Sequence, residues 1–207
     1  MVIIGGLRPL FHSKKITNMI NVLCTQSRSL YYNYDFFNCY DFSRNVFTLD
    51  NNLPCIAHPP CRLFSRLRKF STAPIHEKKI AFFCLDKVRR FGGILEHPRS
   101  STLWHTGNFD LSGQVDSYGG FLRSVDFSWF GYPARKKTML YFVGISPSAL
   151  PPFPISLDAI SACVGSSSSY SNLKALPISL RSQTPRLMIE YFIQVMNIIS
   201  KKNIKKT

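Results

Sequence analysis

Acidic residues are scarce in this chain. Its 207 residues include 11 Asp and Glu against 26 Lys and Arg, which gives a formal net charge of +15 at pH 7. Such an excess of positive charge attracts polyanions and speeds encounter with nucleic acid, so DNA or RNA is the first partner to expect. The alternative is that the Lys-rich ends raise the total charge without forming a binding face.

The cysteines lack the spacing of a metal site or a redox motif. Six of them lie at positions 24, 39, 55, 61, 84 and 163, and no two are separated by two residues. Zinc sites and thioredoxin-like motifs show that spacing, so we expect no bound metal. Reduced thiols and a cytoplasmic location are the simplest interpretation of this pattern.

Long apolar runs and a secretory signal are missing too. No stretch approaches the roughly 18 apolar residues of a membrane span, so we expect no membrane partner. The start, "MVIIGGLRPLFHSKKITNMI", has a short apolar run followed by basic residues, which is the reverse of a signal peptide. The first 34 residues contain no acid, as in a mitochondrial presequence, and that alternative stays open.

The composition predicts one domain with two short ends. Residues 1–20 show no clear period and are expected to form a poorly ordered leader, and 201–207 form a basic tail. The domain over 21–200 is long enough to bury a substantial core. Within it, 145–182 is rich in Pro and Ser and is expected to be a loop.

The clearest pattern is a strand, a helix and a second strand between residues 55 and 98. "CIA" at 55–57 is apolar and stops at two prolines, and "ILEHP" at 94–98 is similar. Between them, 73–91 repeats apolar residues at helical spacing and ends at two glycines. A βαβ unit places the two strands parallel and predicts an α/β fold.

Chemically useful residues follow both strands. His58, Pro59, Pro60 and Cys61 come after the first strand, and the second ends with Glu96, His97 and Pro98. Because ligands of open α/β sheets bind outside the carboxyl ends of the strands, we expect Cys61 and Glu96 to converge. The alternative for Cys61 is a buried thiol, and for either histidine a structural role.

Two further elements complete the expected order. "SVDFSWFGYPARKKTMLYFVG" predicts a β-hairpin with arms at 125–130 and 139–143 and a turn at 131–133. "TPRLMIEYFIQVM" begins a final helix over 185–199 with one apolar side.

These motifs together resemble the DNA (cytosine-5)-methyltransferases, in the short form found in phages and prophages. "HPPCRLFSRL" at 58–67 resembles the family's catalytic Pro-Cys loop, and "ILEHP" at 94–98 resembles its Glu-Asn-Val strand end. The predicted hairpin resembles the family's hairpin, in which a Gly-x-Pro turn precedes basic residues. The similarity covers about residues 22–199. It implies a class I methyltransferase-like (Rossmann-like) fold, with a mostly parallel sheet, a C-terminal antiparallel hairpin and a truncated N-terminus.

The resemblance also implies a mechanism and a site. Cys61 is the expected nucleophile toward carbon 6 of cytosine, its pKa lowered by Arg62, Arg66 and the surrounding backbone. Glu96 is the expected N3 proton partner, its pKa raised by burial. A flipped-out base requires a basic rim that holds DNA phosphates. The candidates for that rim are Arg62, Arg66, Arg68, Lys69, Arg135, Lys136 and Lys137.

The cofactor side departs from the family. S-adenosylmethionine is the implied cofactor, yet no glycine-rich loop followed by a helix is found, and Thr25 and Gln26 stand where a ribose-binding acid is expected. Asp41 is the candidate acid on the adenine side, and Pro59 and Pro60 are further cofactor contacts. A second polypeptide that completes the cofactor site is one possible partner.

Two other interpretations of the whole chain stay open. A catalytically decayed relative would keep the fold and the basic face and bind nucleic acid without chemistry. An unrelated basic interaction protein would match the motifs by chance. Binding of the cofactor would distinguish an active methyltransferase from a decayed relative. Convergence of Cys61 and Glu96 would distinguish these two interpretations from an unrelated protein.

Overall fold

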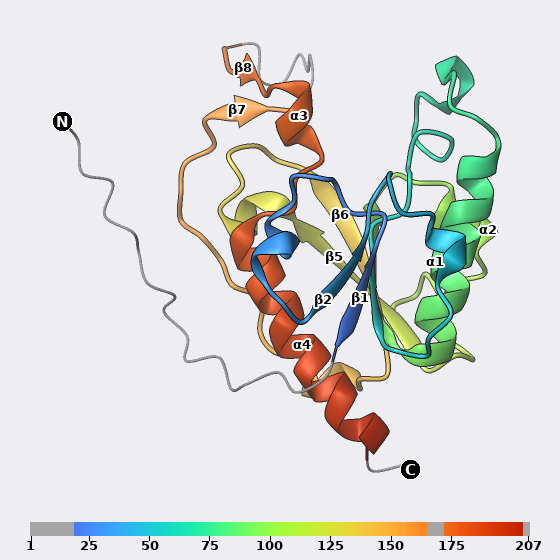
Figure 1. Cartoon of the computed structure of the whole chain (residues 1–207). Coiled ribbons are helices and arrows are strands. Elements are labelled where there is room, and N and C mark those ends of the chain that lie inside the picture. Colours follow the sequence, from blue (N-terminus) through green and yellow to red (C-terminus); the bar gives the residue numbers. More distant parts are fainter. Residues whose placement is uncertain (1–18, 165–171, 205–207) are drawn as a thin grey trace.

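Six strands form one mixed sheet at the centre of the protein (Figure 1). The computed structural model describes residues 19–164 and 172–204. The sheet has the order β2-β1-β3-β4-β6-β5. Its strands are β1 (Ile20–Leu23), β2 (Phe37–Tyr40), β3 (Cys55–Ala57), β4 (Gly93–Pro98), β5 (Gly120–Asp126) and β6 (Lys137–Val143).

The sheet is mostly parallel, as the sequence predicts. β2, β1, β3 and β4 run parallel to one another, whereas β6 is antiparallel to both β4 and β5. The α/β class and the C-terminal antiparallel hairpin are therefore confirmed. The expected leader and truncation fall mainly on residues 1–18, outside the described part of the chain, and Ile20 already belongs to β1.

The order of the strands creates a switch point between β1 and β3. From β1 the chain moves outward to β2, and it then returns to β3 on the other side of β1 and continues to β4. In doubly wound sheets, the crevice outside the carboxyl ends of the strands at such a point holds the ligand. This position makes β1 an inner strand, paired with β2 on one side and with β3 on the other.

The predicted βαβ unit is formed by β3, α1 (His76–Phe91) and β4. α1 starts three residues later than predicted because the Ser71 hydroxyl accepts a bond from the Ala73 amide, in a turn before the helix. Gly92 ends the helix with φ +81°. Gly93 then lets β4 approach β3, since a Cβ there would lie 1.9 Å from the Cys55 carbonyl oxygen.

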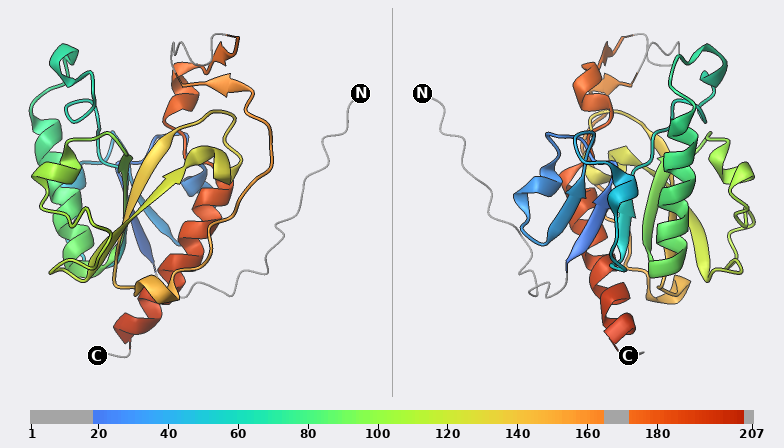
Figure 2. Two further views of the ribbon diagram at one scale, coloured as in Figure 1. Left: turned by 180° about the vertical axis from the view of Figure 1, so that it is seen from behind. Right: turned by 45° about the vertical axis from the view of Figure 1, so that its right-hand side comes forward.

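Two helices cover opposite faces of the sheet (Figure 2). α4 (Arg186–Ile204) packs with one buried cluster that includes Ile56, Ile94 and Phe142. α1 packs with the other, which includes Cys55, Leu95 and Tyr141. Alternate residues of the same strands thus enter different cores, as the period of a strand dictates.

The hairpin and the loop differ in detail from the prediction. The strand β5 ends at Asp126, and the sequence "FSWF" forms a 3-10 turn, η4 (Phe127–Phe130), which the Asp126 carboxylate caps by accepting from the Ser128 amide. The predicted loop at 145–182 contains η5 (Pro147–Ala149), the parallel pair β7 (Ala162–Cys163) and β8 (Lys174–Ala175), and α3 (Ile178–Arg181). The tract "GSSSSYS" lies outside the described residues.

The remaining elements are short. They are η1 (Leu30–Asn33), η2 (Val46–Thr48), η3 (Arg68–Phe70) and α2 (Leu103–Thr106). Over the carboxyl edge of the parallel strands stand two projections on opposite sides, one formed by the segment around η3 and the other by β7, β8 and α3 (Figures 1 and 2). α4 continues past the predicted end at 199.

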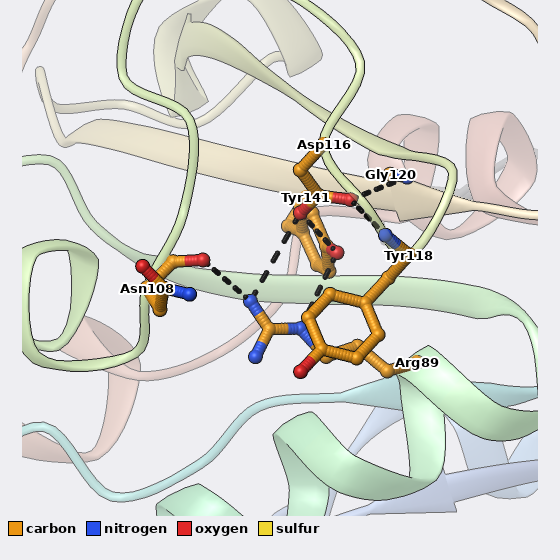
Figure 3. Close-up of polar contacts among 6 residues, drawn as sticks. All are labelled: Arg89, Asn108, Asp116, Tyr118, Gly120 and Tyr141. Atoms are coloured by element: carbon orange, nitrogen blue, oxygen red, sulfur yellow. Dashed lines mark hydrogen bonds and ion pairs between the residues drawn. The ribbon is translucent and has the colours of Figure 1, made fainter.

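A buried polar network fixes the long connection before β5 to α1 (Figure 3). Asp116 accepts hydrogen bonds from the Tyr141 hydroxyl at 2.7 Å and from the amides of Tyr118 and Gly120 at 2.9 Å. The Arg89 guanidinium lies 4.0 Å from the Tyr118 ring centre and donates to the Asn108 carbonyl. Because its polar atoms are satisfied by one another, we assign this network to stability.

Candidate functional site

The loop after β3 is attached to β4 at two places. Parallel pairing sets Ala57 opposite Leu95, so the next residues on each strand, His58 and Glu96, are neighbours at the carboxyl edge. The His58 ring bonds to Glu96 on one face of the sheet, and the His97 ring lies 3.4 Å from the Pro60 carbonyl oxygen on the other. The segment that carries Cys61 is thereby held against β4.

Three side chains form a chain of hydrogen bonds at this edge. Nδ1 of His58 lies 3.1 Å from Oε2 of Glu96, and Nε2 lies 2.9 Å from the Tyr31 hydroxyl. Tyr31 is fully buried in η1, which follows β1, so the chain of bonds spans the switch point between β1 and β3. In the neutral form, Nδ1–H donates to Glu96 and Nε2 accepts from Tyr31.

The Glu96 carboxylate is buried and ionised. Burial alone would raise its pKa, but the Lys136 ammonium, the His58 hydrogen bond and the charges of His58 and His97 together lower it to about 2. The predicted rise of this pKa is therefore wrong for the free protein. The second oxygen of Glu96, Oε1, is buried and has no hydrogen-bond partner. The hydroxyl of Thr138, on the neighbouring strand β6, is also buried without a partner.

Cys61 is half-buried, and its pKa is raised. Burial contributes most, the Glu96 charge adds to the rise, and Lys136 opposes it. The prediction that Arg62 and Arg66 lower this pKa is wrong, because the Arg62 guanidinium pairs with the buried Glu77 of α1 and Lys136 is the cation that acts on the thiol. Glu96 acts on the thiol through its charge, and the two residues lie at the same edge of the sheet.

The basic candidates separate into three groups. Arg66, Arg68 and Lys69 are exposed on the projection around η3. Lys136 is directed into the site, where its ammonium lies 4.0 Å from the Phe127 ring centre and lowers the pKa of both Glu96 and Cys61. Arg135 and Lys137, on either side of it, are exposed and line a groove along the hairpin.

The cofactor candidates lie at the same edge, one strand further along. Asp41 follows β2, and its carboxylate accepts bonds from the Tyr32 hydroxyl at 2.9 Å and from the amide and hydroxyl of Ser43. These bonds lower its pKa. Pro59 is buried and Pro60 half-buried beside His97. The missing acid is expected at Thr25 and Gln26, which follow β1, whereas Asp41 follows β2, the next strand in the sheet.

His58 and Tyr31 are the residues whose importance the sequence interpretation missed. His58 follows a buried strand directly, which is a signal for a ligand crevice, but a lone histidine there is usually structural. Tyr31 stands in a weak pattern between β1 and β2 and carries no motif. Geometry alone joins them to Glu96.

Comparison with known proteins adds no relative. No family model matches the chain, and no curated protein matches it either. Among residues 19–164 and 172–204, no group of three or more His, Cys, Asp or Glu side chains has the arrangement of a metal site. Within the same ranges, no helix has the length and apolarity needed to span a membrane.

Proposed function

We propose that this protein transfers a methyl group from S-adenosylmethionine to carbon 5 of cytosine in DNA, with Cys61 as nucleophile. The observation that carries the proposal is the state of Glu96. One of its oxygens is held by His58, the other is buried without a partner, and its charge acts on Cys61. A buried, unsatisfied carboxylate oxygen is costly, which favours a ligand donor as its missing partner.

The chemistry needs a thiolate and a proton carrier. Sulfur of Cys61 adds to carbon 6 of the base while N3 gains a proton, and the added electron density makes carbon 5 nucleophilic. S-adenosylmethionine supplies the methyl group when bound. Water takes the carbon 5 proton and the sulfur leaves carbon 6. The N3 proton returns through Glu96 to the departing thiolate, which restores the neutral base and the cysteine thiol.

The protonation states of Cys61 and Glu96 in the free protein suit this proton transfer. Cys61 carries its proton at neutral pH because its pKa is raised, whereas Glu96 is ionised because its pKa is lowered. The proton that the thiol loses on attack is the one that N3 gains, and Oε1 of Glu96 carries it between them. His58 holds Oε2 and keeps the carboxylate in place throughout.

The donor set beside the switch point fits the nucleoside part of the cofactor. Asp41 offers a carboxylate for a pair of ribose hydroxyls, and Phe42, directly after it, is fully exposed and offers an aromatic face to adenine. Thr25 and Gln26 follow β1; Thr25 is buried, and the Gln26 amide nitrogen donates to the Ser182 hydroxyl, which leaves its carbonyl oxygen for a ligand.

A second candidate is a relative that binds DNA without chemistry. The segment after β1 supports it, because η1 is a 3-10 turn and Tyr31 from this turn occupies the switch point by bonding His58. The two candidates differ in one property that can be measured directly, the binding of S-adenosylmethionine.

The test is methyl transfer from labelled S-adenosylmethionine to cytosine-containing DNA, followed by digestion and separation of the nucleosides. We expect 5-methylcytosine from the native protein and none from Cys61→Ser or Glu96→Gln. Cys39→Ser, which alters another half-buried thiol, is the matched control and should keep activity. DNA binding without cofactor binding or product would favour the second candidate.

A further inference from the structure

A groove of about 560 Å³ runs along the outer side of the hairpin. Its walls come from β5, the turn η4, the start of β6, the residue after β4 and the segment 156–160. The lining residues include three cations and an aromatic side chain: Arg99, Arg135, Lys137 and Trp129. Its size is that of a pocket for a small ligand or one nucleotide.

The three cations are available for an anion. Arg99, Arg135 and Lys137 are exposed, and no side-chain hydrogen bond or ion pair joins them to another residue in 19–164 or 172–204. Two carboxylates, Asp126 and Asp158, line the same groove, and Oδ1 of Asp126 accepts from the amide and hydroxyl of Ser128 and from the Lys136 amide. Three cations against two carboxylates leave the groove with an excess of positive charge, and among the described residues neither carboxylate forms an ion pair with the three cations.

The outer wall is fixed to the hairpin by the backbone. The Ser156 amide donates to the Trp129 carbonyl at 2.8 Å, and the amides of Ser161 and Ala162 both donate to the Pro133 carbonyl at 3.0 Å. Asp158 in this wall accepts from the Ser156 hydroxyl at 2.6 Å. A preformed wall lowers the ordering cost of binding a ligand.

Lys136 connects the groove to the site of Cys61 and Glu96. Its ammonium acts on both of those residues, whereas its neighbours on either side, Arg135 and Lys137, line the groove. Three consecutive residues thus contribute to two adjacent positions: Lys136 to the site of Cys61 and Glu96, and Arg135 and Lys137 to the groove. In a DNA strand, each base is likewise adjacent to a phosphate.

We infer that this groove binds the backbone phosphate of the nucleotide next to the base held at Cys61 and Glu96. Arg99, Arg135 and Lys137 contact the phosphate oxygens, and Trp129 offers its ring to the neighbouring base. The choice of DNA as the ligand rests on the proposed function, while the position of the anion rests on the groove itself.

The experiment measures binding of a fluorescent single-stranded oligodeoxynucleotide with one cytosine, by anisotropy over a range of salt. Arg99→Gln, Arg135→Gln and Lys137→Gln are the test variants, because their side chains are exposed and their loss does not threaten folding. Lys78→Gln and Lys79→Gln, exposed on α1, are the matched controls.

We expect each groove variant to weaken binding about tenfold at low salt and to reduce the slope of log K against log salt by about 0.7, as for one lost contact to a single strand. The α1 controls should keep both the affinity and the slope. Equal losses in groove and control variants, or no loss in the groove variants, would overturn the inference.

Methyl transfer by the same proteins separates the two proposals. If the groove variants bind DNA weakly but the native protein makes no 5-methylcytosine, the groove proposal is supported and the methyltransferase proposal is refuted. If the native protein is active but the groove variants bind DNA normally, the methyltransferase proposal is supported and the groove proposal is refuted.

Discussion

The Nδ1 atom of His58 lies 3.1 Å from Oε2 of Glu96. The two residues lie at the ends of the paired strands β3 and β4, which are connected through the helix α1. This contact decides which oxygen of Glu96 is left for a ligand. It also helps to lower the pKa of that carboxyl to about 2, against the effect of burial. The role of Glu96 as proton carrier therefore depends on His58.

Replacing His58 tests this dependence. In His58→Leu the pKa of Glu96 should rise, because both the hydrogen bond and the charge of His58 lower it in the native protein. Carbon-13 NMR of the glutamate carboxyls measures the change. Methyl transfer should fall by about 100-fold as Glu96 loses its orientation. His105→Leu, an exposed site, is the control, and an unchanged Glu96 pKa in His58→Leu would refute the positioning role.

Lys136 and Lys137 are adjacent residues with different predicted effects on Cys61. Since Lys136 lowers the pKa of the thiol, Lys136→Gln should raise it and slow alkylation of Cys61 about threefold near neutral pH. Lys137→Gln should leave the rate unchanged, because Lys137 lines the groove. Peptide mass spectrometry after timed iodoacetamide treatment measures both rates. Equal rates in the two variants would contradict this division.

His97 should make the protein sensitive to mild acid. Burial lowers its pKa to about 4, despite the opposing effects of Glu96 and the Pro60 carbonyl, while Lys136 acts in the same direction as burial. Between about pH 6.5 and 4 the unfolded chain binds a proton at this position and the folded chain does not. The free energy of unfolding should therefore decrease as the pH falls through this window, by roughly 3 kcal/mol.

Urea unfolding at a series of pH values measures that loss. His97→Gln keeps a donor for the Pro60 carbonyl and should remove most of the dependence between about pH 6.5 and 4.5. Below that range Glu96 adds a loss of its own, because its folded pKa is depressed. His105→Gln should retain the native profile, and a native-like profile in His97→Gln would contradict the assignment.

Two aspartates that each pair with an arginine of α1 should differ in their contribution to stability. Asp116 is buried with Arg89 and Tyr141 (Figure 3), whereas Asp86 pairs with Arg90 on the surface. Asp116→Asn should lower the free energy of unfolding by about 3 kcal/mol, because it leaves Arg89 buried without its counter-charge. Asp86→Asn should cost under about 0.5 kcal/mol. Similar urea midpoints for both variants would contradict the network's role.

The βαβ unit was predictable because its signals are local. Prolines end β3, two glycines end α1, and both strands are short apolar runs, so the parallel pairing and the meeting of Cys61 with Glu96 follow from general rules. The turn at 127–130 was not predictable from periodicity. Alternating aromatic residues there resemble a strand, and the cap from the Asp126 carboxylate decides the conformation.

The electrostatics of the site could not be obtained from the sequence. Arg62 is the cation nearest to Cys61 along the chain, yet it pairs with Glu77, and the effective cation is Lys136, 75 positions away. The Lys136 charge and the His58 hydrogen bond, at 3.1 Å, together keep the buried Glu96 carboxylate ionised by lowering its pKa. Neither relationship leaves a signal in residue spacing.

The most direct test of the central claim is covalent trapping at Cys61. DNA containing 5-fluorocytosine is incubated with S-adenosylmethionine and the native protein, Cys61→Ser or Cys39→Ser, and the products are analysed by mass spectrometry. We predict a protein–DNA adduct that maps to Cys61, requires the cofactor, persists in Cys39→Ser and is lost in Cys61→Ser. Binding of the DNA without any adduct in the presence of the cofactor would contradict the account.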